Sequence, residues 1–377
     1  MKQFDAAIVA NRSLAESWRE LALEWDSSAG LPEPGQFFTF RASGSTDPLL
    51  RRPLAFSAVD RDASRASAIY QVRGQATRLL SELALGSRID ILGPLGRAFP
   101  APGPDEIPIL VAGGIGLGPV LFLARELGAA RRAASAALAG AAASAGTAAA
   151  PAGAPAAPAA APAASGGVAA SFAGLAPILV LGFRSALAIP RLELPPDAIL
   201  CTDDGSRGFR GTVLDWLERE APEGTARLYA CGPAAMLAAL AAYARRRGWK
   251  ASLSAEQWMA CGVGACMGCA LPRADGKGYL RACADGPVFD SPAPDGAEID
   301  WAAEARRVSA PSPAQSPAPG AAPRSAPSAM HGPAQSATHG PAQSATHGPA
   351  QSPAPGAAPP ATDPRAKGGH EPRAGEA

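Results

Sequence analysis

Residues 107–127, IPILVAGGIGLGPVLFLAREL, decide the fold of this chain. IPILVA has the length and apolar character of a buried strand, GGIGLGP is a glycine-rich turn, and VLFLAREL has helical spacing. This order is typical of a parallel sheet covered by helices. The uncharged run 107–124 reaches the lower length for a membrane span, but its glycines and proline would break a lipid-facing helix. We therefore predict a strand, a turn and a helix, and no membrane span.

Alternating elements continue after this segment and predict an α/β domain over 104–250. Strands are expected at 177–183, 197–202 and 227–231, and helices at 212–220 and 233–247. The stretch 133–176 interrupts the domain after its first helix, carries no charged residue, and consists mostly of Ala, Pro, Gly and Ser. A chain with nothing to bury does not offset its ordering entropy, so we predict a surface insertion.

The residues on either side of this domain have different patterns. Short alternating apolar runs predict an antiparallel barrel over 1–103, with strands at 6–10, 36–41, 54–59, 68–73 and 88–92. Helical spacing at 76–85 predicts a helix that caps one mouth of the barrel. Residues 308–377 are rich in Pro and Ala and repeat HGPAQSAT, which predicts a disordered, partly polyproline-like tail.

Charge and histidine content exclude several functions. The net charge is +1, from 34 Lys and Arg against 33 Asp and Glu, so nothing indicates a nucleic-acid partner. All four histidines lie in the tail, which removes His-dependent nucleophilic catalysis and His-ligated zinc from the folded part. The first residues, MKQFDAAIVANR, do not resemble a secretory leader, and we expect a cytoplasmic protein.

Four of the six cysteines form the most specific pattern in the sequence. Cys261, Cys266, Cys269 and Cys283 are separated by four, two and thirteen residues. This spacing is the plant-type run that ligates a [2Fe–2S] cluster. The alternatives are a four-cysteine zinc knuckle, which usually uses two closely spaced pairs, and a disulfide, which an intracellular location disfavours.

Three shorter motifs indicate nucleotide binding. GGIGLGP at 113–119 follows a strand and opens a helix, where backbone amides favour a pyrophosphate, although an ordinary tight turn explains it equally well. YACGP at 229–233 is a second such turn, or a buried cysteine at a strand end. RRPLAFS at 51–57 offers an arginine suited to a pyrophosphate, or a merely solvated one.

Taken together, the motifs resemble one family. RRPLAFS, GQAT, LGPLGRAF, VAGGIGLGP, YACGP and MACGVGACMGC…CADGPVFD occur in the order found in the ferredoxin-reductase-like electron-transfer subunits of type B dihydroorotate dehydrogenase. The likeness covers residues 1–301 apart from 133–176. It implies an FAD-binding β-barrel at 1–103, an NAD-binding α/β domain at 104–250 and a small [2Fe–2S] module at 251–307.

The resemblance also implies site residues. FAD contacts carry over to Arg52, Pro53, Leu54, Ala55, Ile69, Tyr70, Gln71, Ala76 and Thr77. Ala55 stands where a serine is common, and Ala76 where a glycine is common, which would weaken flavin contacts. The nicotinamide nucleotide would be lined by Gly113, Gly114, Gly116, Cys231, Gly232 and Pro233.

The implied function is electron transfer in pyrimidine biosynthesis. An FMN-containing partner would oxidise dihydroorotate, and electrons would pass singly through the cluster to FAD, which returns a hydride to NAD⁺. Two copies of each chain would form a heterotetramer. Two alternatives remain: a general NAD(P)H-dependent reductase that serves another redox partner, and a non-catalytic zinc-stabilised scaffold. The preference for NAD over NADP stays open, since Asp203 and Asp204 oppose a 2′-phosphate and Arg184, Arg207 and Arg210 would attract one.

Overall fold

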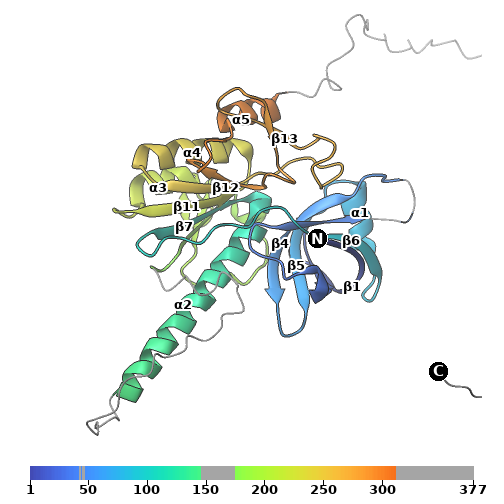
Figure 1. Ribbon diagram of the computed structural model, residues 1–377, viewed down its shortest axis with the longest axis horizontal. Helices are drawn as coiled ribbons and strands as arrows, with labels where there is room; N and C mark the ends of the chain where they lie inside the picture. The colour runs from blue at the N-terminus through green and yellow to red at the C-terminus, as the bar shows by residue number, and fades with distance from the viewer. Residues whose placement is uncertain (42–43, 45–46, 146–174, 311–377) are drawn as a thin grey trace, which may run out of the picture. The chain divides into compact units, whose positions relative to one another are not determined.

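The computed structural model describes residues 1–41, 44, 47–145 and 175–310 (Figure 1). The predicted insertion lies outside these residues over 146–174, and the predicted tail lies outside them over 311–377.

The N-terminal residues form the expected antiparallel barrel. Its six strands close in the order β1-β2-β5-β4-β3-β6. They are β1 (Lys2–Ser13), β2 (Trp18–Glu24), β3 (Phe37–Arg41), β4 (Arg52–Asp60), β5 (Arg65–Gln71) and β6 (Arg88–Leu95). Strand β2 was missing from the sequence analysis, although its apolar residues alternate. Helix α1 (Gln75–Glu82) packs Leu80 into the barrel core, and Asn11 donates a hydrogen bond to the Leu80 carbonyl. The helix therefore covers the barrel interior as predicted.

Strand β3 divides its side chains between two cores. Phe38 and Phe40 point into the barrel with the other large residues of its core. Phe37 instead belongs to the apolar cluster of the C-terminal half of the chain. Because side chains alternate along a strand, the Phe37 and Thr39 side chains share the outer face of β3. This face is where the barrel contacts the cysteine-rich segment described below.

The second domain is a seven-stranded sheet in the order β10-β9-β8-β7-β11-β12-β15. Its strands are β7 (Ile107–Gly113), β8 (Ile178–Phe183), β9 (Ile199–Thr202), β10 (Phe209–Arg210), β11 (Ala226–Cys231), β12 (Lys250–Ser254) and β15 (Val288–Ser291). All pairings are parallel except that of β15 with β12. Apolar residues of α2 (Leu117–Ala145) cover one face, and those of α3 (Val213–Glu220) and α4 (Ala234–Arg247) cover the other. The predicted doubly covered parallel sheet is confirmed.

Two boundaries differ from the expected ones. Helix α2 does not end before the insertion but continues through residue 145. The sheet also extends past residue 250, because β12 spans this position and β15 pairs with it. Backbone hydrogen bonding between distant segments decides this second boundary, and neither strand has a strong pattern of its own.

The C-terminal segment combines a two-stranded sheet with one helix. Strands β13 (Ala270–Pro272) and β14 (Tyr279–Arg281) pair with each other, and α5 (Trp301–Ser309) packs against α4 (Figure 1). None of the helices in the described part of the chain combines the length and apolar character needed to cross a bilayer.

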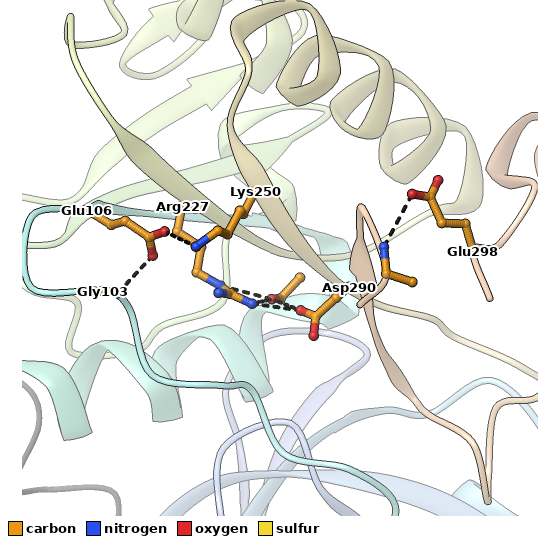
Figure 2. A network of polar contacts seen from close by, with 8 residues as sticks. Gly103, Glu106, Arg227, Lys250, Asp290 and Glu298 are labelled. Atoms are coloured by element: carbon orange, nitrogen blue, oxygen red, sulfur yellow. Dashed lines mark hydrogen bonds and ion pairs between the residues drawn. The ribbon is translucent and has the colours of Figure 1, made fainter. Parts of the chain in front are cut away.

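Polar contacts tie β15 to the sheet at the edge where β7, β11 and β12 begin (Figure 2). Arg227 donates to Asp290 at 2.8 Å and to Ser252 at 3.0 Å. Beside this pair, Lys250 donates to the buried Glu106 at 2.8 Å, and the Gly103 amide donates to the same carboxylate. The network fixes the strand that leads out of the cysteine-rich segment.

Candidate functional site

Two of the four motif cysteines are buried side by side. The sulfur atoms of Cys269 and Cys283 lie 3.2 Å apart, and the Cys283 amide donates to the Cys269 sulfur at 3.4 Å. Both residues belong to the apolar cluster that contains Phe37 of the barrel. Every cysteine of the chain is a free thiol, so the disulfide alternative is wrong. Two sulfurs bound to one tetrahedral metal ion lie about 3.8 Å apart when each bond is about 2.3 Å, so this pair is close to ligand spacing.

The other two cysteines lie on the preceding loop and face outward. Cys266 is exposed and Cys261 is partly exposed. Backbone amides point at the sulfurs: Val263 donates to Cys261 at 3.4 Å, and Gly264 donates to Cys283 at 3.0 Å. Gly262 and Gly264 have φ angles of +71° and +83°, which L-residues with a side chain rarely adopt. The glycines thus let the loop turn its amides toward sulfur.

The thiols differ in how readily they ionise. Burial opposes ionisation of Cys261, but hydrogen bonds from the Val263 amide, the Cys266 side chain and nearby amides lower its pKa to about 6. Burial and the neighbouring Cys269 raise the pKa of Cys283 to about 12. The thiolate is the form of cysteine that binds metal. Cys261 on the loop therefore loses its proton readily, whereas the buried Cys283 needs the positive charge of a metal to lose its proton.

The arrangement fits a two-iron cluster better than a single ion. Within the described residues, no three His, Cys, Asp or Glu side chains converge at the spacing of one metal ion. A structural zinc site would bring all four thiolates onto one ion. In a [2Fe–2S] cluster held by four cysteines, two irons share the ligands. The structure has two thiol pairs, one buried and one on the loop, with amide donors around them. This arrangement matches the ligands of a [2Fe–2S] cluster.

The loop that carries the cysteines packs on the barrel. A Cβ atom built on Gly262 would lie 3.0 Å from the Thr39 methyl carbon and 3.8 Å from a Leu95 methyl carbon. Thr39 pairs with Pro53 of β4, and Leu95 lies on β6. The cysteine loop therefore rests on the outer face of β3. This strand is the neighbour of β4, on which flavin contacts were predicted.

A second contact joins two motifs that lie far apart in the sequence. The Arg97 amide donates to the Gly286 carbonyl at 2.6 Å, so LGPLGRAF meets CADGPVFD. Gly96 has a φ angle of +77°, and a Cβ there would lie 2.5 Å from Pro287 and 2.8 Å from the Phe37 ring. Only glycine allows this close approach, which fixes the cysteine segment against the end of β6.

The two predicted glycine turns also meet. A Cβ on Gly116 would lie 2.0 Å from the Cys231 carbonyl oxygen, and one on Gly232 would lie 3.0 Å from the Gly113 carbonyl oxygen. A Cβ on Gly113 would lie 3.0 Å from the Cδ atom of Pro233. Gly114, with a φ angle of +54°, turns between them. The carboxyl ends of β7 and β11 thus meet at the start of α2, the place where parallel sheets commonly bind nucleotides.

The start of α2, beside these two turns, contacts the barrel. A Cβ on Gly118, in the first turn of α2, would lie 3.6 Å from Ser57 and 3.8 Å from Ile69. Burial raises the pKa of the Cys231 thiol to about 12, so this thiol stays neutral.

No motif in the sequence pointed to Glu256. Its side chain is exposed to solvent, yet surrounding protein raises the pKa of its carboxyl group, with Arg73 acting in the opposite direction.

The predicted flavin residues divide into accessible and buried groups. Arg52, Pro53, Leu54 and Ala55 are partly exposed along β4, and Gln71 is partly exposed at the end of β5. Ile69 is buried beside α2. The Thr77 hydroxyl is held at the start of α1, where it accepts hydrogen bonds from the amides of Arg73 and Gly74.

Tyr70 and Ala76 have side chains that point into the barrel core. The Tyr70 hydroxyl donates to Asn11 at 2.9 Å. These two residues therefore offer a cofactor their backbone atoms and not their side chains.

Barrel, parallel sheet and cysteine pairs define a ferredoxin-reductase-like electron-transfer protein with an iron–sulfur domain. The family model "Iron-sulfur cluster binding domain of dihydroorotate dehydrogenase B" matches residues 256–293. The chain belongs to the family of electron transfer subunits of dihydroorotate dehydrogenase B (NAD(+)). The subunit from Geobacillus thermodenitrificans is 35% identical over 290 residues, 75% of this chain and 94% of that protein. The subunit from Desulforamulus reducens is 31% identical over 77% of this chain and 97% of that protein.

The fold is also shared with a solved structure. An NADH-dependent reduced ferredoxin-NADP oxidoreductase structure superposes with a TM-score of 0.58 at 22% identity. It covers 80% of this chain and 92% of the other. The likeness confirms the ferredoxin-reductase-like architecture. Together with the family, it makes this chain the electron-transfer subunit of an oxidoreductase.

Proposed function

We propose that this chain carries electrons between an FMN-containing dihydroorotate dehydrogenase subunit and NAD⁺, through a [2Fe–2S] cluster and FAD. The cluster is held by Cys261, Cys266, Cys269 and Cys283. FAD lies along β4, with contacts from Arg52, Pro53, Leu54 and Ala55. NAD⁺ lies against the two glycine turns, Gly113–Gly116 and Cys231–Pro233. The barrel at 1–103, the sheet domain at 104–250 and the segment 251–307 each hold one of the three groups.

One observation supports this proposal above the others. The cysteine loop rests on β3, since a Cβ on Gly262 would lie 3.0 Å from the Thr39 methyl carbon, and β3 pairs directly with β4. Cluster ligands and predicted flavin contacts are thus separated by one strand. Such a short separation, filled by packed protein, suits electron transfer between a bound cluster and a bound flavin. A non-catalytic scaffold would not require it.

The cofactors divide the chemistry: the cluster carries one electron, and the flavin accepts electrons singly and releases two as a hydride. The chain's residues bind and orient them. Amides of Val263, Gly264 and Gly268 donate to the cysteine sulfurs and stabilise their negative charge. Burial keeps the Cys231 thiol neutral, so this residue adds no negative charge at the two glycine turns.

The cysteine loop also offers a surface for the partner subunit. Trp258, Val263 and Met267 are exposed, with 85%, 44% and 49% of their surface accessible. Large exposed apolar side chains mark interaction sites, and Trp is enriched among residues that dominate binding energy. Since Cys266 on the same loop is exposed, a partner seated here would approach the cluster closely. We propose two copies of each chain in the complex, in the cytoplasm, where free thiols persist.

Co-expression with an FMN-containing dihydroorotate dehydrogenase chain tests the proposal. Purified without oxygen, the complex is expected to contain iron, acid-labile sulfide, FAD and FMN, and to reduce NAD⁺ with dihydroorotate. This chain alone should oxidise NADH with an artificial acceptor and form no orotate. Iron-free material that contains zinc, or a chain that binds no such partner, would overturn the proposal.

A further inference from the structure

Helix α2 contributes side chains to the cores of two domains, and it runs alongside β4 (Figure 1). Phe122 is 1% exposed and packs in the barrel core with Phe38 and Phe56. The residues before and after it, Leu121 and Leu123, belong instead to the apolar cluster that contains side chains of β7 and β8. Since α2 begins beside the two glycine turns, one helix reaches from the proposed nucleotide site into the barrel.

Polar contacts add to this packing on the same face of α2. Arg125 and Glu126 follow Phe122 by three and four positions, a spacing that places side chains on one side of a helix. The Arg125 guanidinium donates to the Ser57 carbonyl of β4 at 3.1 Å. Arg61, in the turn after β4, donates to both carboxylate oxygens of Glu126, at 3.0 Å and 2.8 Å. A contact of this two-point kind fixes direction as well as distance.

These contacts connect the two proposed cofactor sites. Residues 52–55 of β4 carry the proposed flavin contacts, and Arg61 directly follows this strand. The other end of the connection is the start of α2, where NAD⁺ is proposed to lie. Hydride transfer needs reacting atoms about 3 to 3.5 Å apart, and a displacement of about 1 Å can cost about 100-fold in rate. The direction of α2 on β4 is therefore a quantity on which the reaction depends.

We propose that Arg61, Phe122 and Glu126 are positioning residues for hydride transfer, because they set the direction of α2 on β4 and with it the place of the nicotinamide relative to the flavin. This inference rests on the proposed function, since it requires FAD at β4 and NAD⁺ at the glycine turns. The step concerned is NADH + FAD → NAD⁺ + FADH⁻, in which one hydride carries both electrons. The three residues act through α2 and β4 and not by contact with the reacting atoms.

Charge reversal at Arg61 tests the inference in the holoprotein. In Arg61→Glu two carboxylates face each other, so α2 is expected to shift on β4. The rate of flavin reduction by NADH, followed by stopped-flow absorbance, should fall about tenfold or more. The long-wavelength charge-transfer absorbance of the reduced flavin with NAD⁺ should weaken, and this second measurement reports contact of the two rings without turnover. FAD content, iron content and affinity for NAD⁺ should equal those of the natural protein.

A charge-swapped variant and a matched control accompany this test. Arg61→Glu combined with Glu126→Arg restores a pair of opposite charges and should recover most of the rate and of the charge-transfer absorbance. Arg246→Glu reverses one charge of an exposed pair with Glu218 that lies within the sheet domain, and it should change neither. Arg61→Glu is expected to fold, because the contact between Arg97 and Gly286 joins the barrel to the cysteine segment independently of α2.

The outcomes separate this inference from the function on which it rests. If the natural protein binds no FAD, or if NADH does not reduce it, the proposed function fails and the inference falls with it. If NADH reduces the natural protein and Arg61→Glu at the same rate, with the same charge-transfer absorbance, the inference alone is overturned. Loss of FAD from Arg61→Glu, or a slow rate that the charge-swapped variant does not restore, would also overturn it, because the substitution would then act through folding and not through the pair.

Discussion

At the scale of single residues, the four cysteines differ in accessibility, and this difference suits an electron carrier. Cys269 and Cys283 are 2% and 3% exposed, whereas Cys266 is exposed. The buried pair belongs to the apolar core of the C-terminal half of the chain, and the exposed cysteine faces outward. A cluster bound here would have one side toward the flavin domain and the other toward solvent or a partner.

Replacing Cys266 tests the ligand assignment. Cys266→Ser is expected to give a folded protein that retains flavin and has lost or degraded its cluster, because a serine oxygen is a poorer ligand for iron than a thiolate. Iron analysis and the visible spectrum check this. Cys201→Ala, which removes a buried cysteine of the sheet domain, should keep the full iron content. Unchanged iron in Cys266→Ser would show that this residue is not a ligand.

At the scale of elements, the end of β6 is held against the cysteine segment without any space for a side chain at Gly96. This contact joins the barrel to the segment that follows Cys283, since Arg97 donates its amide hydrogen to Gly286. The contact holds the cysteine segment at a fixed place on the barrel. The glycine is required for two reasons: its positive φ angle and its closeness to Pro287.

Gly96→Ala and Gly86→Ala separate these two reasons. Gly86 has a similar φ angle of +81°, but nothing lies within 4 Å of its Cβ position. We expect Gly86→Ala to cost about 1 to 2 kcal/mol of unfolding free energy from backbone strain. Gly96→Ala should cost about 1 to 3 kcal/mol more from overpacking. Denaturant titration measures both, and Gly96→Ala should also lose iron faster to a chelator. Equal costs would show that the joint tolerates a methyl group.

The ion pair between the buried Glu106 and the exposed Lys250, at the end of the sheet where the strands begin, gives a pH-dependent contribution. Burial opposes ionisation of Glu106, but Lys250 and the Gly103 amide outweigh it and lower its pKa below the ordinary value of 4.5. A carboxyl group with a lowered pKa stabilises the fold above its unfolded-state pKa and loses this contribution as the pH falls through the folded-state pKa.

We therefore expect Glu106→Gln to reduce the unfolding free energy by about 1 to 2 kcal/mol at pH 7, with the difference shrinking below pH of about 4. Urea titrations at several pH values measure it. Glu218→Gln, which breaks an ion pair with Arg246 whose side chains are 50% and 59% exposed, should change stability by less than about 0.5 kcal/mol. A difference between Glu106→Gln and the natural protein that is independent of pH would contradict the electrostatic origin.

At the scale of the whole molecule, the order of the parts along the proposed electron path follows from contacts between distant segments. The cysteine loop packs on β3, β3 pairs with β4, and β4 meets the first turn of α2 beside the proposed nucleotide site. Each step joins residues far apart in the sequence. The exposed loop at Trp258 stands at the beginning of this path and is the proposed partner surface.

Trp258→Ala tests that surface. Removing an exposed indole should leave the isolated protein's iron content and its NADH oxidation unchanged, and it should weaken binding to the FMN-containing subunit about tenfold or more. Isothermal titration or gel filtration with the partner measures this. Leu187→Ala, at an apolar residue that is 93% exposed in the sheet domain, should have no effect. Equal affinities of both variants would place the partner elsewhere.

Much of the fold could be predicted because its signals are local. The segment 107–127 has a strand, a turn and a helix in contiguous patterns, and five barrel strands alternate clearly enough to be recognised. The boundary at residue 250 could not be predicted, because β15 joins the sheet by pairing with β12 across the intervening cysteine segment. Likewise, the family resemblance implies Tyr70 as a flavin contact, while the alternation of β5 directs its side chain into the barrel.

The sequence by itself determined much of the chemistry: the cysteine spacing indicates an iron–sulfur cluster, the absence of histidine outside the tail excludes His-dependent catalysis from the folded part, and the resemblance to one family implies a flavin and a nucleotide. These properties depend on residue types at short separations, which a chain carries before it folds. Only the tertiary structure decided that Gly116 touches Cys231, that Gly96 admits Pro287, and that Gly262 packs against Thr39. Such contacts arise when distant segments pack at van der Waals distance, and no local pattern encodes them.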